Sequence, residues 1–299
     1  MEWGEAKGQK GAMIESLKKL FFISRPVSWV NTAYPFAAAF LVSGGAIGPL
    51  FILATLYFLI PYNLLMYGIN DVFDYESDIR NPRKGGIEGM REQRAFHPTI
   101  VIVSIALNIP FVIWLIILGN LAGAIGLVVL LFFVIAYSMK WLRFKERPVI
   151  DSVTSSLHFV GPAIYALLLL GFSSDAWPYI IALFLWGMAS HALGAIQDII
   201  PDRKGKIASI ATVFGAKVVT RIVIIFYSVA SLLVALQGFP YTIIGITGLI
   251  YVANVLPYWS INDNTSAAVN KAWRRFIWLN MIAGFVVTIV LLLQFKILS

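Results

Sequence analysis

Two long stretches of the chain, Pro26–Asn70 and Ala95–Met139, contain no Asp, Glu, Lys or Arg. A helix needs about 20 apolar residues to cross roughly 30 Å of hydrocarbon, so each stretch can form two crossings joined by a tight turn. Of the 299 residues, 59% are hydrophobic and 13% are charged. Soluble domains are closer to half apolar and a quarter charged. We therefore expect an all-α polytopic membrane protein.

The apolar stretches predict nine transmembrane helices, which form a single domain over residues 21–299 after a polar tail of residues 1–20. Glycine-containing pairs such as Gly44-Gly45 and Gly119-Asn120 are typical of turns between paired spans. The predicted spans are Phe21–Val42, Pro49–Ile69, His97–Leu118, Leu121–Met139, Ser152–Gly171, Trp177–Gln197, Val218–Leu236, Tyr241–Ser260 and Trp273–Leu293.

The basic residues are unevenly distributed among the connections. A net charge of +8 is compatible with nucleic-acid binding, but the placement of the charge argues for membrane topology instead. Lys and Arg occur in the N-terminal tail and in every second connection, and Lys296 is the exception. The positive-inside rule then predicts a cytoplasmic N-terminus, cytoplasmic long loops and an outside C-terminus. The chain has no Cys, which excludes disulfides and Cys-ligated metals.

A first acidic cluster, Asp71, Asp74 and Asp78, closes the second predicted span. Spacings of three and four residues place these carboxylates on one face of a helix. Like charges on one face repel one another unless a cation lies between them. Because the cluster is at a helix end, we expect its side chains to be exposed and to contribute little to folding.

A second acidic cluster, Asp198 and Asp202, closes the sixth predicted span on the same side of the membrane. The two residues share a face if the helix continues, although we expect a break at Pro201. Ionisable groups at membrane depth are functional candidates. His191 lies one to two turns before Asp198, which could direct it into the same cavity.

Basic residues accompany both clusters. Acids alone would indicate a cation channel or a Ca²⁺ site, whereas acids with interleaved bases indicate a metal-bound polyanion such as diphosphate. Mg²⁺ takes oxygen ligands and commonly bridges carboxylates to phosphates. A diphosphate at the mouth of an apolar bundle implies an apolar tail, and therefore a prenyl diphosphate. The bases are Arg80, Arg83, Lys84, Lys140, Arg143, Lys145, Arg147, Arg203, Lys204 and Lys206.

The motif Asn70-Asp71-x-x-Asp74-x-x-x-Asp78, followed by Asn81-Pro82-Arg83-Lys84, resembles the first aspartate motif of the UbiA-type membrane prenyltransferases. The motif Asp198-x-x-x-Asp202-Arg203-Lys204 resembles the second. Ser24–Phe36, Lys145–Asp151 and Ala195–Ala211 resemble the lycopene elongases of C50 carotenoid synthesis. Two departures are Lys206, where many members have Gly, and Gly194-Ala195, where some members have a third acid.

This resemblance implies a nine-helix bundle with a cytoplasmic-side active site. It implies Mg²⁺-dependent transfer of an allylic group to a lipophilic acceptor within membrane lipids, and Mn²⁺ is an alternative metal. We favour dimethylallyl as the group transferred and lycopene as the acceptor. The implied metal ligands are Asp71, Asp74, Asp78, Asp198 and Asp202. The implied diphosphate ligands are Asn70, Arg83, Lys84, Lys145, Arg203 and Lys204. The implied catalytic residues are Asp71, Asp74, Asp198 and Tyr137, whose phenol would lie near the cation.

Two alternatives stay open at this stage. An aromatic acceptor, such as a quinone precursor or a tetrapyrrole, would use the same chemistry. A carboxylated ring needs a basic partner when buried, and Arg25 is the one base on a span edge left over for it. A secondary transporter of an anionic solute is disfavoured because the charges gather at one face. Asp151 is expected to cap the fifth predicted span.

Overall fold

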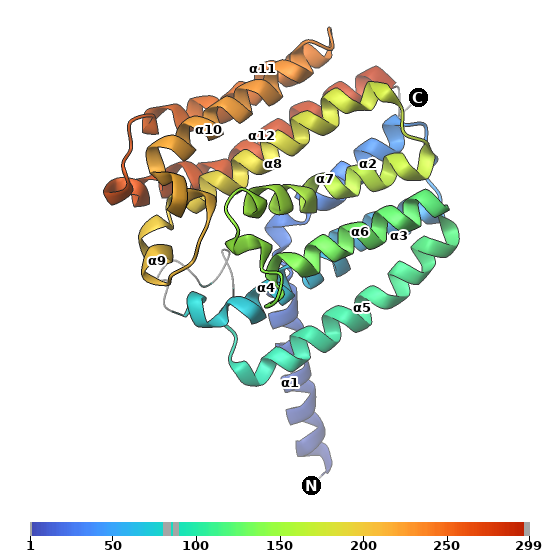
Figure 1. Ribbon diagram of the computed structural model, residues 1–299. Helices are drawn as coiled ribbons and strands as arrows, with labels where there is room; N and C mark the ends of the chain where they lie inside the picture. Colours follow the sequence, from blue (N-terminus) through green and yellow to red (C-terminus); the bar gives the residue numbers. More distant parts are fainter. Residues whose placement is uncertain (1, 80–84, 86–89, 296–299) are drawn as a thin grey trace.

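The structure, a computed structural model, describes residues 2–79, 85 and 90–295, which are helical with turns and short 3-10 segments and contain no strand (Figure 1). The all-α prediction is confirmed. The α-helices are α1 (Glu2–Ile23), α2 (Val30–Val42), α3 (Pro49–Leu59), α4 (Pro61–Asp78), α5 (His97–Leu118), α6 (Leu121–Ser138), α7 (Ile150–Leu170), α8 (Trp177–Ile196), α9 (Ile199–Lys204), α10 (Ile210–Ala235), α11 (Tyr241–Val255) and α12 (Asn270–Phe295).

Eight helical segments of the described chain are long and apolar enough to cross a membrane, so the predicted count of nine is not confirmed. The apolar helix that falls short of this length is α2, because its 13 residues extend only about 20 Å. The predicted span Phe21–Val42 is interrupted ahead of α2. There, Arg25 adopts a left-handed backbone with φ of 51° and Pro26 begins a 3-10 turn.

The helices pack around two large apolar cores. One lies among α2 to α7 and contains Phe36, Tyr57 and Tyr165. The other is formed mainly by α8, α10, α11 and α12. Small residues bring the helices close together. At Gly187 of α8, for example, an added Cβ would overlap Ser156 of α7.

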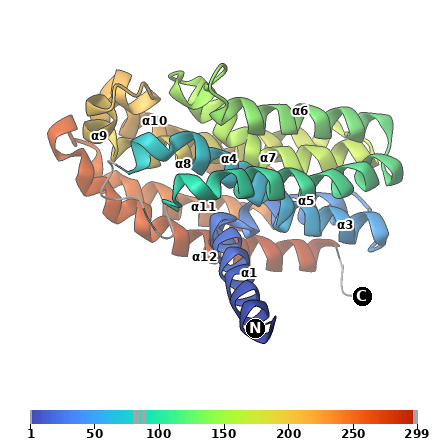
Figure 2. The same ribbon diagram turned by 90° about the horizontal axis from the view of Figure 1, so that it is seen from below.

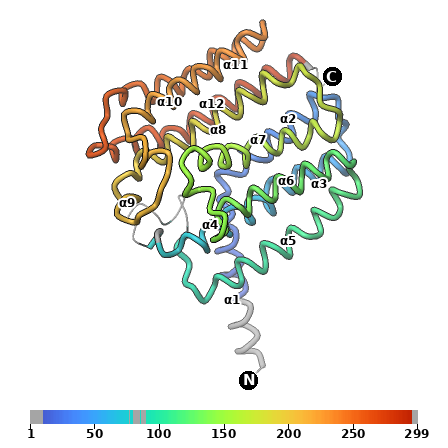
Figure 3. Tube along the Cα trace, viewed as in Figure 1, coloured from blue at the N-terminus to red at the C-terminus, as the bar shows by residue number. Residues whose placement is uncertain are grey.

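The bundle has two different ends. Short connections join α2 to α3, α5 to α6 and α7 to α8 at one end, where α12 also finishes (Figure 3). The end of α4, the loop of residues 139–149 and α9 gather at the opposite end (Figures 1 and 2). Helix α1 projects away from the bundle (Figure 2). The polar loops and both acidic clusters are therefore concentrated at one end, as the charge pattern predicts.

Candidate functional site

The first acidic cluster occupies the last two turns of α4, which is helical through Asp78. The predicted spacing therefore places the three carboxylates on one face of this helix. The expectation that they are exposed is wrong. Asp71 is 4% exposed, Asp78 is 5% exposed, and the side chain of Asp74 is 13% exposed. Arg25 and the segment after residue 89 contact Asp71, and the loop of residues 139–149 contacts Asp74.

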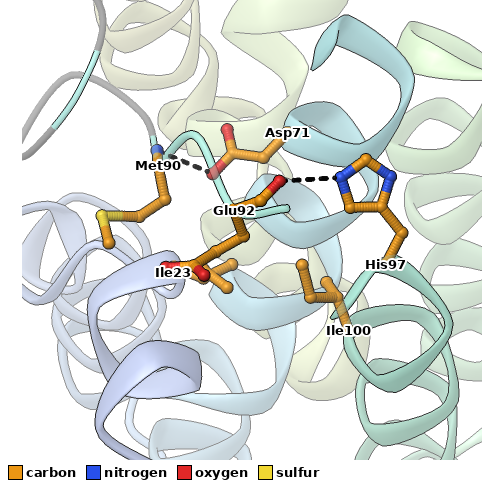
Figure 4. A pocket seen from close by; sticks show the side chains of 6 residues that line it. All are labelled: Ile23, Asp71, Met90, Glu92, His97 and Ile100. Carbon is orange, nitrogen blue, oxygen red and sulfur yellow. Dashed lines mark hydrogen bonds between the residues drawn. The ribbon is translucent and has the colours of Figure 1, made fainter. Parts of the chain in front are cut away.

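Arg25 is the principal partner of Asp71. Its guanidinium lies 2.6 Å from Oδ1 of Asp71 and packs over the Tyr67 ring, 4.2 Å from the centroid. The backbone N–H of Met90 donates to Oδ2 of Asp71 at 3.2 Å (Figure 4). Arg25 is therefore not available to neutralise the carboxylate of an aromatic acceptor. The break between α1 and α2 brings this base onto α4.

The small hollow beside Asp71 also includes His97 at the start of α5 (Figure 4). The Nε2 atom of His97 lies 3.1 Å from the carbonyl oxygen of Glu92. The imidazole thus fixes the chain that follows residue 89 against α5.

The loop of residues 139–149 contributes two bases to the first cluster. The Lys145 ammonium group forms an ion pair with Asp74, and the Arg143 guanidinium lies 3.9 Å from the same carboxylate. Arg143 also pairs with Glu146 and has a left-handed backbone with φ of 40°. This loop therefore places positive charge directly on the face of α4 that carries the acids.

Lys145 lies within electrostatic range of both acidic clusters. Burial lowers the pKa of its ammonium group to about 7, and the neighbouring Glu146 carboxylate opposes this shift. The negative charges of Asp71 and Asp202 also act on the ammonium group. Lys145 therefore pairs with the first cluster and is also attracted by the negative charge of the second.

The second cluster begins at the break between α8 and α9. Asp198 is the N-cap residue of α9 and Asp202 lies in its first turn, where the Asp202 N–H donates to the Asp198 carbonyl at 2.9 Å. Both side chains are half-buried. The expected break at Pro201 is wrong, because the chain breaks before Asp198. Pro201 fits the first turn of α9, where its missing N–H has no helical partner to lose.

The remaining predicted bases are arranged differently. Arg203 donates to Asp263 at 2.7 Å and to the Thr212 carbonyl at 2.8 Å, so its guanidinium joins α9 to α10 and to the 3-10 segment Asp263–Val269. Lys204 is exposed in the last turn of α9. Arg83 and Lys84 lie outside the described residues.

A chain of polar side chains extends from the first cluster into the bundle. The Ser138 hydroxyl donates to the Asn70 amide oxygen at 3.0 Å. The neighbouring Tyr137 hydroxyl lies 3.1 Å from Nε2 of His191, so the imidazole points toward α6. Nδ1 of His191 lies 3.0 Å from the Ser152 hydroxyl. Sequence reasoning missed both serines, because a single hydroxyl in an apolar span gives no periodic signal.

Asp151 does not cap α7 in the way we expected. The N-cap residue is Val149, and Asp151 is the second residue of the helix with no exposed surface. Its two oxygens accept the N–H groups of Ser152 and Ile210, each at 2.7 Å. The carboxylate therefore joins the N-terminal turns of α7 and α10, where negative charge is favoured.

The oxygen-rich donor set fits a hard divalent cation. Within the described ranges, no three His, Cys, Asp or Glu side chains converge as a ready-made metal site. Mg²⁺ commonly binds through one or two carboxylates and completes its shell with waters and substrate phosphates. Two separate carboxylate clusters with a lysine in range of both suit a metal that arrives together with a polyanion.

Comparison with known proteins identifies the family. Residues 32–281 match the UbiA prenyltransferase family. The chain belongs to this family. This UbiA-family protein is 47% identical to a lycopene elongase/hydratase of Corynebacterium glutamicum, over 94% of the chain and 98% of that protein. It is 45% identical to a C(50) beta-cyclic carotenoids biosynthesis protein of Dietzia sp., over 92% of the chain and 65% of that protein.

Solved structures of the UbiA family share the fold. A UbiA homolog from Archaeoglobus fulgidus bound to DMAPP and Mg²⁺ aligns with a TM-score of 0.65 at 18% identity, over 89% of this chain and 99% of that one. A digeranylgeranylglyceryl phosphate synthase aligns with a TM-score of 0.61 at 17% identity, over 91% and 98%. The family match and the long apolar helices together identify the protein as an integral membrane prenyltransferase, as the motifs predict. The transporter alternative is set aside.

Proposed function

We propose that this prenyltransferase moves a dimethylallyl group from its diphosphate to lycopene in a Mg²⁺-dependent reaction. The observation that carries the proposal is the pair of carboxylate clusters at one end of an apolar bundle, with Lys145 in electrostatic range of both. The names of the two carotenoid relatives support the acceptor. The DMAPP and Mg²⁺ bound to the Archaeoglobus fulgidus homolog support the donor and the metal.

The five aspartates would hold the metal together with the substrate diphosphate. When bound, Mg²⁺ neutralises the charge of the departing diphosphate, and Mn²⁺ suits the same oxygen ligands. Lys145 would stabilise that charge by hydrogen bonding from a buried position. Asn70 would hold a phosphate oxygen or a metal-bound water. Arg83, Lys84 and Lys204 would contribute from the flanking loops.

The reaction begins when the carbon–oxygen bond of the allylic diphosphate breaks. The terminal double bond of the acceptor attacks the allylic cation, so a carbon–carbon bond forms and positive charge remains on a tertiary carbon of the acceptor. Tyr137 would present its ring to the cation. The apolar bundle excludes bulk water and orients the double bond. The name elongase/hydratase of the 47% identical relative supports a last step in which water adds.

An apolar cavity of about 430 Å³ between α6 and α7 supports a linear hydrocarbon acceptor. Its lining on α6 runs from Ala122 to Phe133, which is about 16 Å along the helix, and Phe133 lies one turn before Tyr137. Gly126 and Gly161 also line the cavity. The lining has no basic residue, and Arg25 is paired with Asp71. A carboxylated aromatic ring would find no counter-charge there.

The test is a direct competition between acceptor classes. Membranes that contain the protein are incubated with dimethylallyl diphosphate and either lycopene or 4-hydroxybenzoate, and products are separated by chromatography. We expect a lengthened carotenoid that is absent with the Asp74→Ala variant. A prenylated benzoate without any lengthened carotenoid would overturn the acceptor and leave the prenyltransferase activity intact.

We also propose that the end of the bundle with the acidic clusters faces the cytoplasm. The basic loops lie at that end and α12 finishes at the other (Figure 1). A reporter fused after Arg203 should then report cytoplasm, and one fused after Ser299 should report the outside. The opposite result at Arg203 would invert the proposed orientation.

A further inference from the structure

Three side chains from three different helices form a hydrogen-bonded relay inside the bundle. It consists of Tyr137 on α6, His191 on α8 and Ser152 on α7, with separations of 3.1 Å and 3.0 Å at the two imidazole nitrogens. Both partners of the imidazole are hydroxyl groups, which donate or accept equally well. His191 can therefore gain a proton at one nitrogen without losing either hydrogen bond.

One carboxylate lies within electrostatic range of the relay. It is the buried Asp151, which acts on the His191 imidazole. Tyr137 adjoins Ser138, which donates to Asn70 beside the first cluster. Tyr137 and His191 are half-buried, so both keep some accessible surface.

His158 provides a contrast from the same region. Its ring lies edge-on to Tyr137 at 5.1 Å and is 3% exposed. Its Nε2 atom faces the Phe133 carbonyl oxygen at 3.4 Å, and a carbonyl can only accept. The geometry of His158 is that of a packed core histidine, whereas His191 is bonded to exchangeable groups at both nitrogens.

We propose that His191 is the base that takes a proton from the water added to the acceptor cation. The inference rests on the proposed transfer to lycopene. The water oxygen forms a carbon–oxygen bond to the tertiary carbon and loses one proton. That proton passes to the Tyr137 oxygen while the Tyr137 proton moves to Nε2 of His191. The product is a tertiary alcohol, and His191 later releases the proton to solvent.

The decisive variant is His191→Gln, because an amide keeps hydrogen bonds to both hydroxyls but cannot accept the proton. Reactions run with dimethylallyl diphosphate and lycopene in ¹⁸O-labelled water, and products are analysed by mass spectrometry. Wild-type enzyme should incorporate one ¹⁸O per added group. The variant should still lengthen lycopene, with a ratio of alcohol to alkene that falls by about tenfold or more. His158→Gln is the matched control and should retain the wild-type ratio.

The carbon skeleton of the product tests the proposed acceptor, and its oxygen content tests the proposed role of His191. Wild-type enzyme that fails to lengthen lycopene would overturn the proposed acceptor. Wild-type enzyme that lengthens it without taking up ¹⁸O would overturn the role of His191 alone, as would an unchanged alcohol ratio in His191→Gln. If His191→Gln does not fold, Tyr137→Phe serves as the second variant. It keeps the aromatic ring but removes the hydroxyl that bonds to His191, so the ratio of alcohol to alkene should fall in the same way. Wild-type ¹⁸O uptake by this variant would refute the relay.

Discussion

The buried ion pair between Arg25 and Asp71 allows stability and turnover to be separated in one set of variants. Asp71→Ala removes a carboxylate that we assign to the metal and diphosphate site, and it leaves the Arg25 guanidinium buried without its partner. We therefore expect this variant to lose both activity and stability. The double variant Arg25→Ala/Asp71→Ala removes the stranded charge, so it should regain stability and stay inactive.

The magnitude follows from the burial of the pair. Removing one partner of a buried ion pair costs about 3–5 kcal/mol, largely because a buried charge is left behind. The Asp71 side chain is 3% exposed and that of Arg25 is 16% exposed, so solvent relieves part of the penalty. We expect Asp71→Ala to destabilise the fold by about 3 kcal/mol. The coupling energy of the double-mutant cycle should then be about 2 kcal/mol.

Denaturant titration of purified protein in detergent, followed by tryptophan fluorescence, measures the stability of the four forms of the cycle. Trp29 is a local probe, because its indole N–H donates to the Ser24 carbonyl at 3.0 Å beside Arg25. Diphosphate release measures turnover. For Asp71→Ala and for the double variant, turnover should fall by about two orders of magnitude or more, which is about 3 kcal/mol in transition-state stabilisation.

The matched control is the ion pair of Arg94 and Glu76, whose side chains are 70% and 59% exposed. Its coupling should be about 0.5 kcal/mol or less. If the losses of Arg25→Ala and Asp71→Ala simply add in the double variant, the reasoning from burial is refuted. If the double variant regains turnover, Asp71 serves to neutralise Arg25 and is not a metal ligand.

Three further outcomes test other parts of the site. Asp74→Ala and Asp198→Ala should each lower diphosphate release by about two orders of magnitude, and EDTA should abolish it until Mg²⁺ is restored; activity that survives EDTA would exclude the metal. Asp151→Asn should lower the free energy of unfolding by about 1 to 3 kcal/mol, because one backbone N–H loses its acceptor; unchanged stability in denaturant titration would contradict this. Val129→Trp should fill the cavity between α6 and α7 and raise KM for lycopene. Val128→Trp should leave KM unchanged, because Val128 is a more exposed neighbour outside the cavity lining. Equal KM values for the two variants would show that the acceptor does not use this cavity.

The features that could be predicted from the sequence are those that depend on local spacing. The length of hydrocarbon to be crossed fixes the length of an apolar helix, so the bounds of α5 coincide with the predicted span His97–Leu118. Helical periodicity places Asp71, Asp74 and Asp78 on one face once α4 continues through all three. The two aspartate motifs are also local patterns, and they predict the family that the family match shows.

Tertiary structure decided which charges meet and which are covered. Arg25 lies 46 residues from Asp71 and Arg203 lies 60 residues from Asp263, and no local pattern links partners at such separations. The burial of Asp71 likewise comes from segments that fold over the end of α4.

The relay of Tyr137, His191 and Ser152 exists only because α6, α7 and α8 pack side by side. The spacing along one helix is set by its backbone hydrogen bonds, and the sequence determines it directly. The environment of a side chain is set by whichever helices pack against it, and that is decided when the bundle assembles.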